Sequence, residues 1–178
     1  EICSGDSTNL SVSGLLNDAT VWYLYEDGCG ISPIASNASG IFDVNPTNNT
    51  TYYIRGEDGT GCINETTLSC NSISIIVNPL PSVSLSVPPS LCINEELNSN
   101  ISGGLPLGGI YSGPGCVDDG NGSTYNIDPN NAGIGTHVIT YEFTDSNGCS
   151  SFMQNSFNIY SLPAVSIVDP GDFCDNLN

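Results

Sequence analysis

An internal repeat of about 80 residues constrains the fold of this chain more than any other feature of its sequence. The segment Leu80-Pro81-Ser82-Val83-Ser84-Leu85 returns 82 residues later as Leu162-Pro163-Ala164-Val165-Ser166-Ile167, and Leu91-Cys92 returns at the same offset as Phe173-Cys174. A third, looser copy begins at Ile2-Cys3. Self-similarity at a fixed period is typical of tandem domains.

The repeat predicts two small domains joined by short, proline-bearing linkers. We expect a first domain at 1–79 that lacks its opening strand, a second at 80–161, and the opening strand of a further repeat at 162–178. Proline makes such linkers semi-rigid. The last segment has two interpretations: it belongs to a longer array, or it is donated to the first domain of the next molecule, because an unpaired sheet edge accepts a strand. Donation would bring Cys174 near Cys3 of the next molecule.

The chain is predicted to be all-β. Helical periodicity is almost absent, and short alternating runs rich in Val, Ile, Thr, Tyr and Phe are broken by Gly, Asn, Asp and Pro every eight to twelve residues or so, which is typical of sandwiches and barrels. The expected strands are Asn9–Ser13, Thr20–Tyr25, Ile41–Val44, Thr51–Arg55, Ser72–Val77, Val83–Val87, Leu97–Ile101, Gly109–Ser112, Thr124–Ile127, His137–Phe143 and Phe152–Tyr160.

The charge balance excludes several classes of partner. The chain has 19 Asp or Glu but only one Lys or Arg, which is Arg55, and its net charge is −18. One cation cannot neutralise a row of phosphates, so we expect no nucleic acid, no anionic lipid surface and no phosphoryl-transfer chemistry. No apolar run reaches about 18 residues, so no membrane insertion is expected.

Eight cysteines indicate an oxidising compartment. No Cys-x-x-Cys pair occurs and His137 is the only imidazole, so disulfides explain the cysteines better than metal binding does. We therefore expect an extracellular or cell-surface protein with no cofactor except a possible calcium ion. The residues expected to be oxidised are Cys3, Cys29, Cys62, Cys70, Cys92, Cys116, Cys149 and Cys174.

The sequence resembles the tandem immunoglobulin-like (Ig-like or PKD-like) repeats of large surface and secreted adhesin-type proteins of Bacteroidota. The resemblance rests on Ile2–Ser7, Val21-Trp22-Tyr23, Gly28-Cys29-Gly30, Thr51–Gly56, Gly108–Gly115, Ala132–His137 and Thr144–Cys149. It implies immunoglobulin-like β-sandwiches, export to the cell surface, and a stalk or adhesive role. The chain departs from the pattern at Cys116, where the family usually has an apolar residue.

The resemblance also implies disulfide pairings: Cys92–Cys149, Cys3–Cys62 and Cys29–Cys70. Geometry leaves these open, because the start of the second strand and the turn after the sixth lie at opposite ends of an immunoglobulin fold, whereas bonded Cα atoms lie within about 7 Å. The alternatives are local pairs, Cys62–Cys70 and Cys92–Cys116, or a pair that links neighbouring repeats.

One acidic loop is a candidate calcium site. Asp118, Asp119 and Asn121 place several oxygen ligands on a glycine-rich loop, which suits a hard cation. The loop fails the EF-hand spacing because no Glu closes it at the twelfth position. Acidic turn residues explain the same cluster, since Asp, Asn and Gly favour turns.

Asn-x-Ser/Thr motifs are in modest excess and predict glycosylation in a secretory setting. They occur at Asn9, Asn37, Asn48, Asn49, Asn64, Asn100 and Asn121.

Catalysis is not expected. His137 lies in a predicted strand without a nucleophile motif, and the adjacent Glu95 and Glu96 would point to opposite faces. Aromatic residues such as Trp22 are expected to pack the core.

We therefore expect an extracellular structural or adhesive segment that acts as stalk, spacer or fibre subunit. Its partners would be copies of itself, neighbouring repeats, or surface glycans and proteins. The alternative is a carbohydrate- or protein-binding accessory module of an exported protein, which an exposed aromatic platform would favour.

Overall fold

The computed structural model of the chain describes residues 1–16, 19–57 and 70–168. Strands contain 51% of these residues and helix only 3%, which confirms the all-β prediction. Contacts divide the chain into two compact units. The first comprises Glu1–Pro81 together with Thr144–Ser151, and the second comprises Ser82–Phe143 together with Phe152–Asn178. A short turn from the second sequence repeat thus belongs to the first unit.

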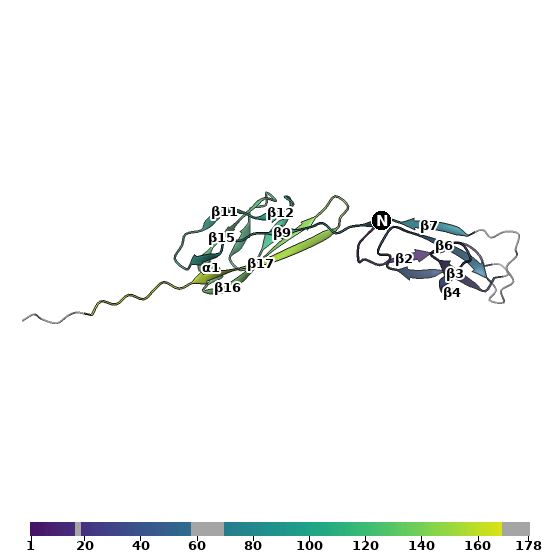
Figure 1. The fold of residues 1–178 in the computed structure, drawn as a ribbon, viewed down its shortest axis with the longest axis horizontal. Helices are drawn as coiled ribbons and strands as arrows, with labels where there is room; N and C mark the ends of the chain where they lie inside the picture. The colour runs from purple at the N-terminus through teal and green to yellow at the C-terminus, as the bar shows by residue number, and fades with distance from the viewer. Residues whose placement is uncertain (17–18, 58–69, 169–178) are drawn as a thin grey trace, which may run out of the picture. The chain divides into compact units, whose positions relative to one another are not determined.

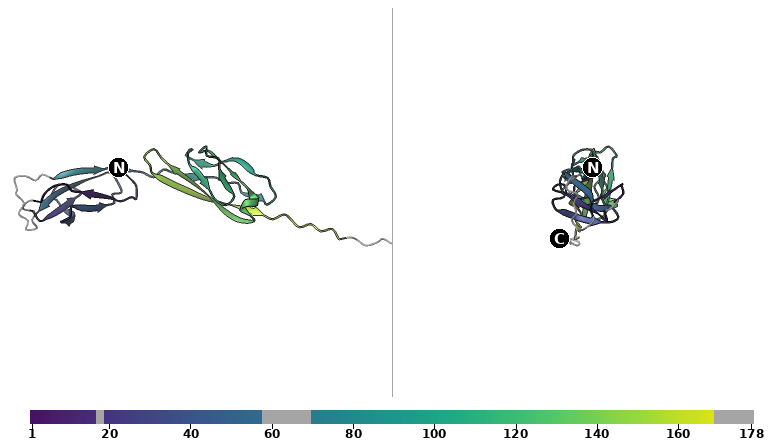
Figure 2. Two further views of the ribbon diagram at one scale, coloured as in Figure 1. Left: turned by 180° about the vertical axis from the view of Figure 1, so that it is seen from behind. Right: turned by 90° about the vertical axis from the view of Figure 1, so that its right-hand side faces the viewer.

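The first unit is a two-layered sandwich (Figures 1 and 2). One sheet has the strand order β4-β3-β6-β7; the other layer contains the antiparallel pair β2-β5, and β1 pairs in parallel with β8. The strands are β1 (Ile2–Cys3), β2 (Thr8–Ser11), β3 (Val21–Tyr25), β4 (Pro33–Asn37), β5 (Ile41–Val44), β6 (Thr50–Glu57), β7 (Asn71–Ile75) and β8 (Val77–Asn78).

Apolar side chains from both layers of the first unit meet between the sheets. The alternation of buried and exposed positions along β5 is what a strand with one buried face requires. The buried cluster consists of Leu10, Leu24, Phe42, Val44, Tyr52 and Ile75, with Trp22 packed against it.

The second unit has the same architecture. Its main sheet has the order β10-β17-β16-β13, a second sheet has the order β11-β15-β14, and β9 pairs with β12. The elements are β9 (Ser84–Leu85), β10 (Ser90–Cys92), β11 (Asn98–Ser102), β12 (Gly104–Leu105), β13 (Ile110–Ser112), β14 (Cys116–Asp118), β15 (Thr124–Ile127), α1 (Pro129–Ala132), β16 (Gly135–Thr144) and β17 (Ser150–Tyr160).

Three tyrosine rings form the centre of the second core. The ring of Tyr111 lies 4.4 Å from that of Tyr125 and 4.5 Å from that of Tyr141, measured between centroids. Tyr141 approaches the backbone closely, since a Cβ on Gly104 would lie 2.6 Å from its ring. The glycines of this region therefore make room for the tyrosine cluster.

Several short elements were not predicted from the sequence, namely β1, β4, β10, β12, β14 and α1. Helix α1 is a single turn capped by Asp128, whose carboxylate accepts bonds from the amides of Asn130 and Asn131. In the part of the chain that is described, no helix is long and apolar enough to cross a membrane.

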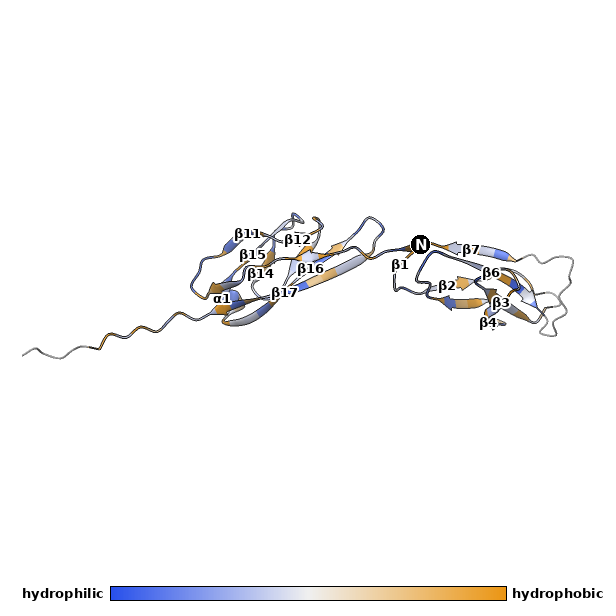
Figure 3. Cartoon of the chain, viewed as in Figure 1, coloured by the Kyte–Doolittle hydropathy of each residue, from blue (hydrophilic) through white to orange (hydrophobic). Residues whose placement is uncertain are grey.

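Beyond β17 the described chain continues as an extended segment, Leu162–Val168, with no strand partner among the described residues. Figure 3 shows hydrophobic residues along this segment. Val165 and Ile167 are 85% and 93% exposed, whereas their counterparts in the repeat, Val83 and Leu85, are each 9% exposed. The same sequence motif is therefore buried in one repeat and exposed in the next.

Candidate functional site

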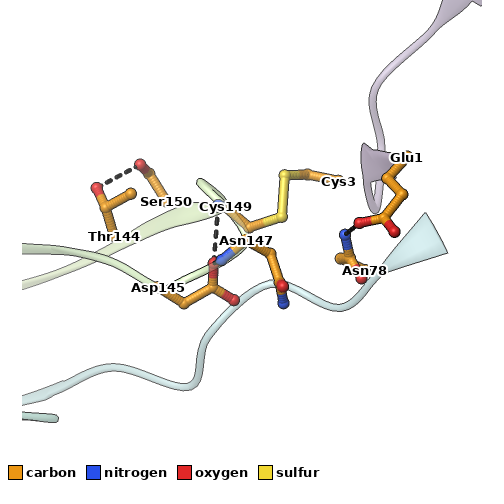
Figure 4. The surroundings of a disulfide bond; sticks show 8 residues. All are labelled: Glu1, Cys3, Asn78, Thr144, Asp145, Asn147, Cys149 and Ser150. Carbon is orange, nitrogen blue, oxygen red and sulfur yellow. Dashed lines mark hydrogen bonds between the residues drawn. A yellow bond between two sulfur atoms is a disulfide. The ribbon is translucent and has the colours of Figure 1, made fainter. Parts of the chain in front are cut away.

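A disulfide bond joins Cys3 to Cys149 (Figure 4). Their Cα atoms are 5.5 Å apart and their positions are separated by 146 residues. Cys3 is the last residue of β1, where it lies opposite Asn78 of β8, and Cys149 lies in the turn between β16 and β17. Cys149 is fully buried. The bond therefore joins segments that come from two successive sequence repeats.

The turn that carries Cys149 is fixed by its own hydrogen bonds. The Asp145 carboxylate accepts from the amides of Asn147 and Cys149, both at 2.9 Å. The Asp145 amide donates to the Cys149 carbonyl at 3.0 Å, and Gly148 adopts a φ of +83°, which favours glycine. The sequence Asp-Ser-Asn-Gly-Cys thus presents its cysteine in one defined position.

This bond corrects two of the pairings that the family resemblance implied. The structure forms neither Cys3–Cys62 nor Cys92–Cys149, because Cys149 is already bonded to Cys3. Cys92 lies opposite Tyr160, at the far end of β17 from the turn. β17 has 11 residues, so its two ends lie about 33 Å apart at the rise of a β-strand. A pair that links neighbouring repeats, left open by the sequence, is the one that forms.

The remaining cysteines fall into three groups. Cys29 is bonded to Cys70 with a Cα separation of 5.7 Å, which is the third pairing implied by the resemblance. Cys92 and Cys116 are free and half-buried, so the expectation that every cysteine is oxidised does not hold for them. The Cys92–Cys116 alternative is not formed either. Cys62 and Cys174 lie outside the described residues.

The thiol of Cys116 is poorly placed to react. It packs against the second core from β14. Burial, together with the carboxylates of Asp118 and Asp119, raises its pKa to about 11. Because the thiolate is the reactive form, Cys116 is suited to packing rather than to chemistry.

The only permanent cation of the chain is used inside the first unit. Arg55 Nε lies 2.7 Å from Glu57 Oε1, and the guanidinium stands 5.3 Å from the centre of the Tyr25 ring. The Tyr25 hydroxyl donates to the same carboxylate, and burial together with that bond raises the pKa of Tyr25 to about 12. Arg55 and Glu57 are two apart on β6, so they share one face, and this spacing is already visible in the sequence.

The side-chain oxygens of the candidate calcium loop accept hydrogen bonds from nearby groups of the protein. Asp118 accepts from the amides of Tyr111 and Gly120, at 2.8 and 2.7 Å. Asp119 accepts from the Thr124 hydroxyl at 2.6 Å and from the Asn126 amide group. Asn121 accepts from two further amides of the loop, those of Ser123 and Thr124. Among the described residues no group of three or more acidic, histidine or cysteine side chains is arranged to hold a metal, and the calcium site remains a prediction of the sequence.

The predicted glycosylation sites differ in how freely they are presented. Asn37 is half-buried and bound into a turn, since its Nδ2 donates to the Ile41 carbonyl at 2.7 Å and its Oδ1 accepts from Gly40. Asn64 lies outside the described residues. The exposed sites are Asn9, Asn48, Asn49, Asn100 and Asn121.

Neither candidate for catalysis has a catalytic geometry. His137 Nε2 donates to the Gly133 carbonyl at 2.8 Å, and its ring contacts Phe157 at a centroid distance of 5.6 Å. Glu95 accepts the Cys92 amide at 2.9 Å. Both side chains therefore stabilise local structure.

Half of the 14 aromatic side chains are buried, and these are not available to form a flat aromatic binding surface. Those with 3% exposure or less are Tyr25, Phe42, Tyr52, Tyr111, Tyr125, Tyr141 and Phe157.

One comparison with known families gives a match. Residues 1–79 match the family model described as Ig-like domain CHU_C associated. The match coincides with the first sequence repeat and confirms the immunoglobulin-like prediction. No curated protein matches the chain.

Proposed function

Since residues 1–79 form an immunoglobulin-like domain of the CHU_C-associated family, we propose that the chain is a structural segment of an exported protein, acting as stalk, spacer or fibre subunit at the cell surface. The observation that carries this proposal is the Cys3–Cys149 bond, which fastens one sequence repeat to the next. A covalent bond between repeats suits a structural segment whose role is to hold domains in series. Stable disulfides also fit an extracellular setting.

The distribution of charge supports an exposed, extracellular position. With Arg55 paired to Glu57, the remaining acids of a chain of net charge −18 have no permanent cation to offset them. Such a surface resists non-specific association with other anionic surfaces. The role proposed here is non-catalytic, because His137 and Glu95 bond to nearby backbone groups rather than to a nucleophile.

Immunogold electron microscopy of native cells tests the proposal. Antibodies raised against the purified chain should label the outside of intact cells, and mild protease treatment of those cells should remove the label. Labelling confined to the cytoplasm would refute the proposal.

The fibre form of the proposal is strand donation by Val165–Val168. Val83 and Leu85 fill the core of the second unit, and the described part of the first unit contains no strand that corresponds to β9. Sedimentation of the oxidised chain tests this form. Concentration-dependent oligomers that vanish in a Val165→Asp/Ile167→Asp variant, but persist when the exposed Leu107 is changed to Asp, would support donation. A monomer at every concentration would leave only the stalk and spacer forms.

A further inference from the structure

The free thiol of Cys92 occupies the same structural position as the bonded thiol of Cys3. Cys3 lies opposite Asn78 in the parallel pair β1-β8, and Cys92 lies opposite Tyr160 in the parallel pair β10-β17. Asn78 and Tyr160 are themselves equivalent, since each stands two residues before a Leu-Pro that opens the next repeat. The two cysteines therefore share one register with the end of their own repeat.

The hydrogen bonds around the two cysteines also correspond. The amide after Cys3 donates to Asn78 O at 2.8 Å, and the amide after Cys92 donates to Tyr160 O at 3.0 Å. Each cysteine carbonyl then accepts, at 3.0 Å, the amide three residues further on, that of Asp6 or of Glu95. The match extends through the turn that follows, so Cys3 and Cys92 have the same backbone hydrogen bonding on both sides of the side chain.

The two cysteines differ in whether a second cysteine lies within bonding distance. The first unit includes the turn Thr144–Ser151, which the following repeat contributes and which supplies Cys149. The second unit holds no such turn among its described residues, and Cys92 is free there. Apart from this turn, the strand pairing and backbone hydrogen bonds around Cys92 reproduce those of Cys3, which is bonded in the same structure.

We infer that Cys92 is the acceptor for a disulfide with the Gly-Cys turn of a following immunoglobulin-like repeat, joined to this chain through Leu162–Val168. The bond would repeat the Cys3–Cys149 bond one period further on. This inference deepens the proposed function and rests on it, because it requires that repeats be joined in series.

The exposed segment after β17 is a second, independent indication of the same partner. Val165 and Ile167 are almost fully exposed, whereas Val83 and Leu85 at the equivalent positions are buried in the core of the repeat that they open. A following repeat would bury Val165 and Ile167 in the same way. The Gly-Cys turn of that repeat would then reach Cys92 from the C-terminal side in sequence, as Thr144–Ser151 reaches Cys3 in the first unit.

Bond formation requires an oxidant, which an exported protein meets as a disulfide-bearing oxidoreductase or a small disulfide. Cys92 and the partner cysteine each lose one proton, and the two electrons released reduce the oxidant's disulfide to two thiols. Cys116 does not compete, because its thiol packs on the core and its raised pKa keeps it protonated. One of the two free thiols is thus placed for bonding and the other for packing.

A lengthened chain tests the inference. A second copy of Leu80–Ser161 is inserted after Ser161, so that every residue of the chain is kept and the 82-residue period continues. The inserted copy carries Cys92→Ser, which leaves a single Cys92 in the molecule. The protein is oxidised in a glutathione buffer, digested with pepsin at acid pH without reduction, and mapped by mass spectrometry.

We expect a Cys92–Cys149 peptide pair in the lengthened chain and none in the original chain. Alkylation of Cys92 by a maleimide should fall at least about tenfold on lengthening, while alkylation of Cys116 stays unchanged. Changing the inserted copy's Cys149 to Ser should restore the reactivity of Cys92. The Cys3–Cys149 bond in the same molecule is the internal control that this turn sequence folds and oxidises.

The inference is overturned if Cys92 remains a free thiol while Cys3–Cys149 forms, or if Cys92 bonds instead to another cysteine or to a second molecule. Surface labelling decides the proposed function separately. Positive labelling with a free Cys92 refutes only this inference, whereas cytoplasmic labelling refutes the proposed function whatever Cys92 does.

Discussion

Two buried tyrosines of the second unit should respond in opposite directions to the same substitution. Tyr125 and Tyr141 are both 0% exposed. The Tyr141 hydroxyl accepts the Gly109 amide at 2.9 Å and donates to the Pro106 carbonyl. The Tyr125 hydroxyl has no hydrogen-bond partner in the described part of the chain. Tyr→Phe removes one oxygen from the same kind of core at each position.

The expected change in unfolding free energy depends on which groups lose a hydrogen bond when each hydroxyl is removed. Tyr141→Phe leaves the buried Gly109 N–H without a partner, at a cost of about 1–3 kcal/mol, so the free energy of unfolding should fall by about that amount. Pro106 is exposed, so its carbonyl can bond to water instead. Tyr125→Phe removes a buried hydroxyl that is already unpaired, so unfolding free energy should be unchanged or rise by up to about 1 kcal/mol.

Urea unfolding followed by far-UV circular dichroism measures both variants. At a denaturant slope of about 2 kcal/mol per molar urea, Tyr141→Phe should lower the midpoint of the second unit by roughly 0.5–1.5 M. Hydrogen exchange of peptides from β15 and β16 confirms which unit is affected. Equal destabilisation by the two substitutions, or a larger loss at Tyr125, would refute the reasoning.

Three further predictions concern the disulfide, the partly buried cation and the free thiol. Cys149→Ser should lower the free energy of unfolding by about 2–5 kcal/mol, seen as a lower melting temperature. A reductant should lower the melting temperature of the native chain by more than that of the variant, which has only Cys29–Cys70 left to reduce. Arg55→Leu should destabilise the first unit by about 1–3 kcal/mol, because it leaves the Glu57 carboxylate without a cation. The loss is measured by Trp22 fluorescence in urea, and Glu57→Gln should recover most of it; no recovery would contradict the pairing. Because the pKa of Cys116 rises from 9.0 to about 11 on folding, its contribution to stability is complete below pH 9 and is lost as the pH rises toward 11. Cys116→Ala should therefore flatten the fall in melting temperature across that window, and an unchanged slope would show that another group is responsible.

The repeat and the strand pattern predicted the architecture well, because both depend on local sequence. Alternation along Ile41–Val44 and Thr124–Ile127 marks one buried face, and each run is a strand with those bounds. The short edge strands were missed. β4 and β14 contain Pro, Asn or Asp and bury little, so local composition alone does not reveal them.

The disulfide pattern was harder to predict, because it depends on positions distant in sequence. Alignment of the repeats correctly equates Cys3 with Cys92 and places Cys149 in a Gly-Cys turn. Pairing within each repeat looked natural, yet an 11-residue strand separates Cys92 from that turn. The length of β17 was visible in the sequence as the alternating run Phe152–Tyr160, and it would have argued against Cys92–Cys149.

The Cys3–Cys149 bond also determines how the chain would carry a pulling force. Tension applied between the two ends of the chain crosses from Cys3 to Cys149 through the sulfur atoms, so the residues between them bear no load along their backbone. With 146 positions bridged, reducing this bond together with Cys29–Cys70 would release on the order of 500 Å of additional extensible length, at about 3.3–3.6 Å per residue. Cys29–Cys70 lies inside the bypassed segment and adds nothing to the load path until the first bond is cut. In an oxidising medium this stretch of chain behaves under load as a short tether, and in a reducing one as a long, extensible one.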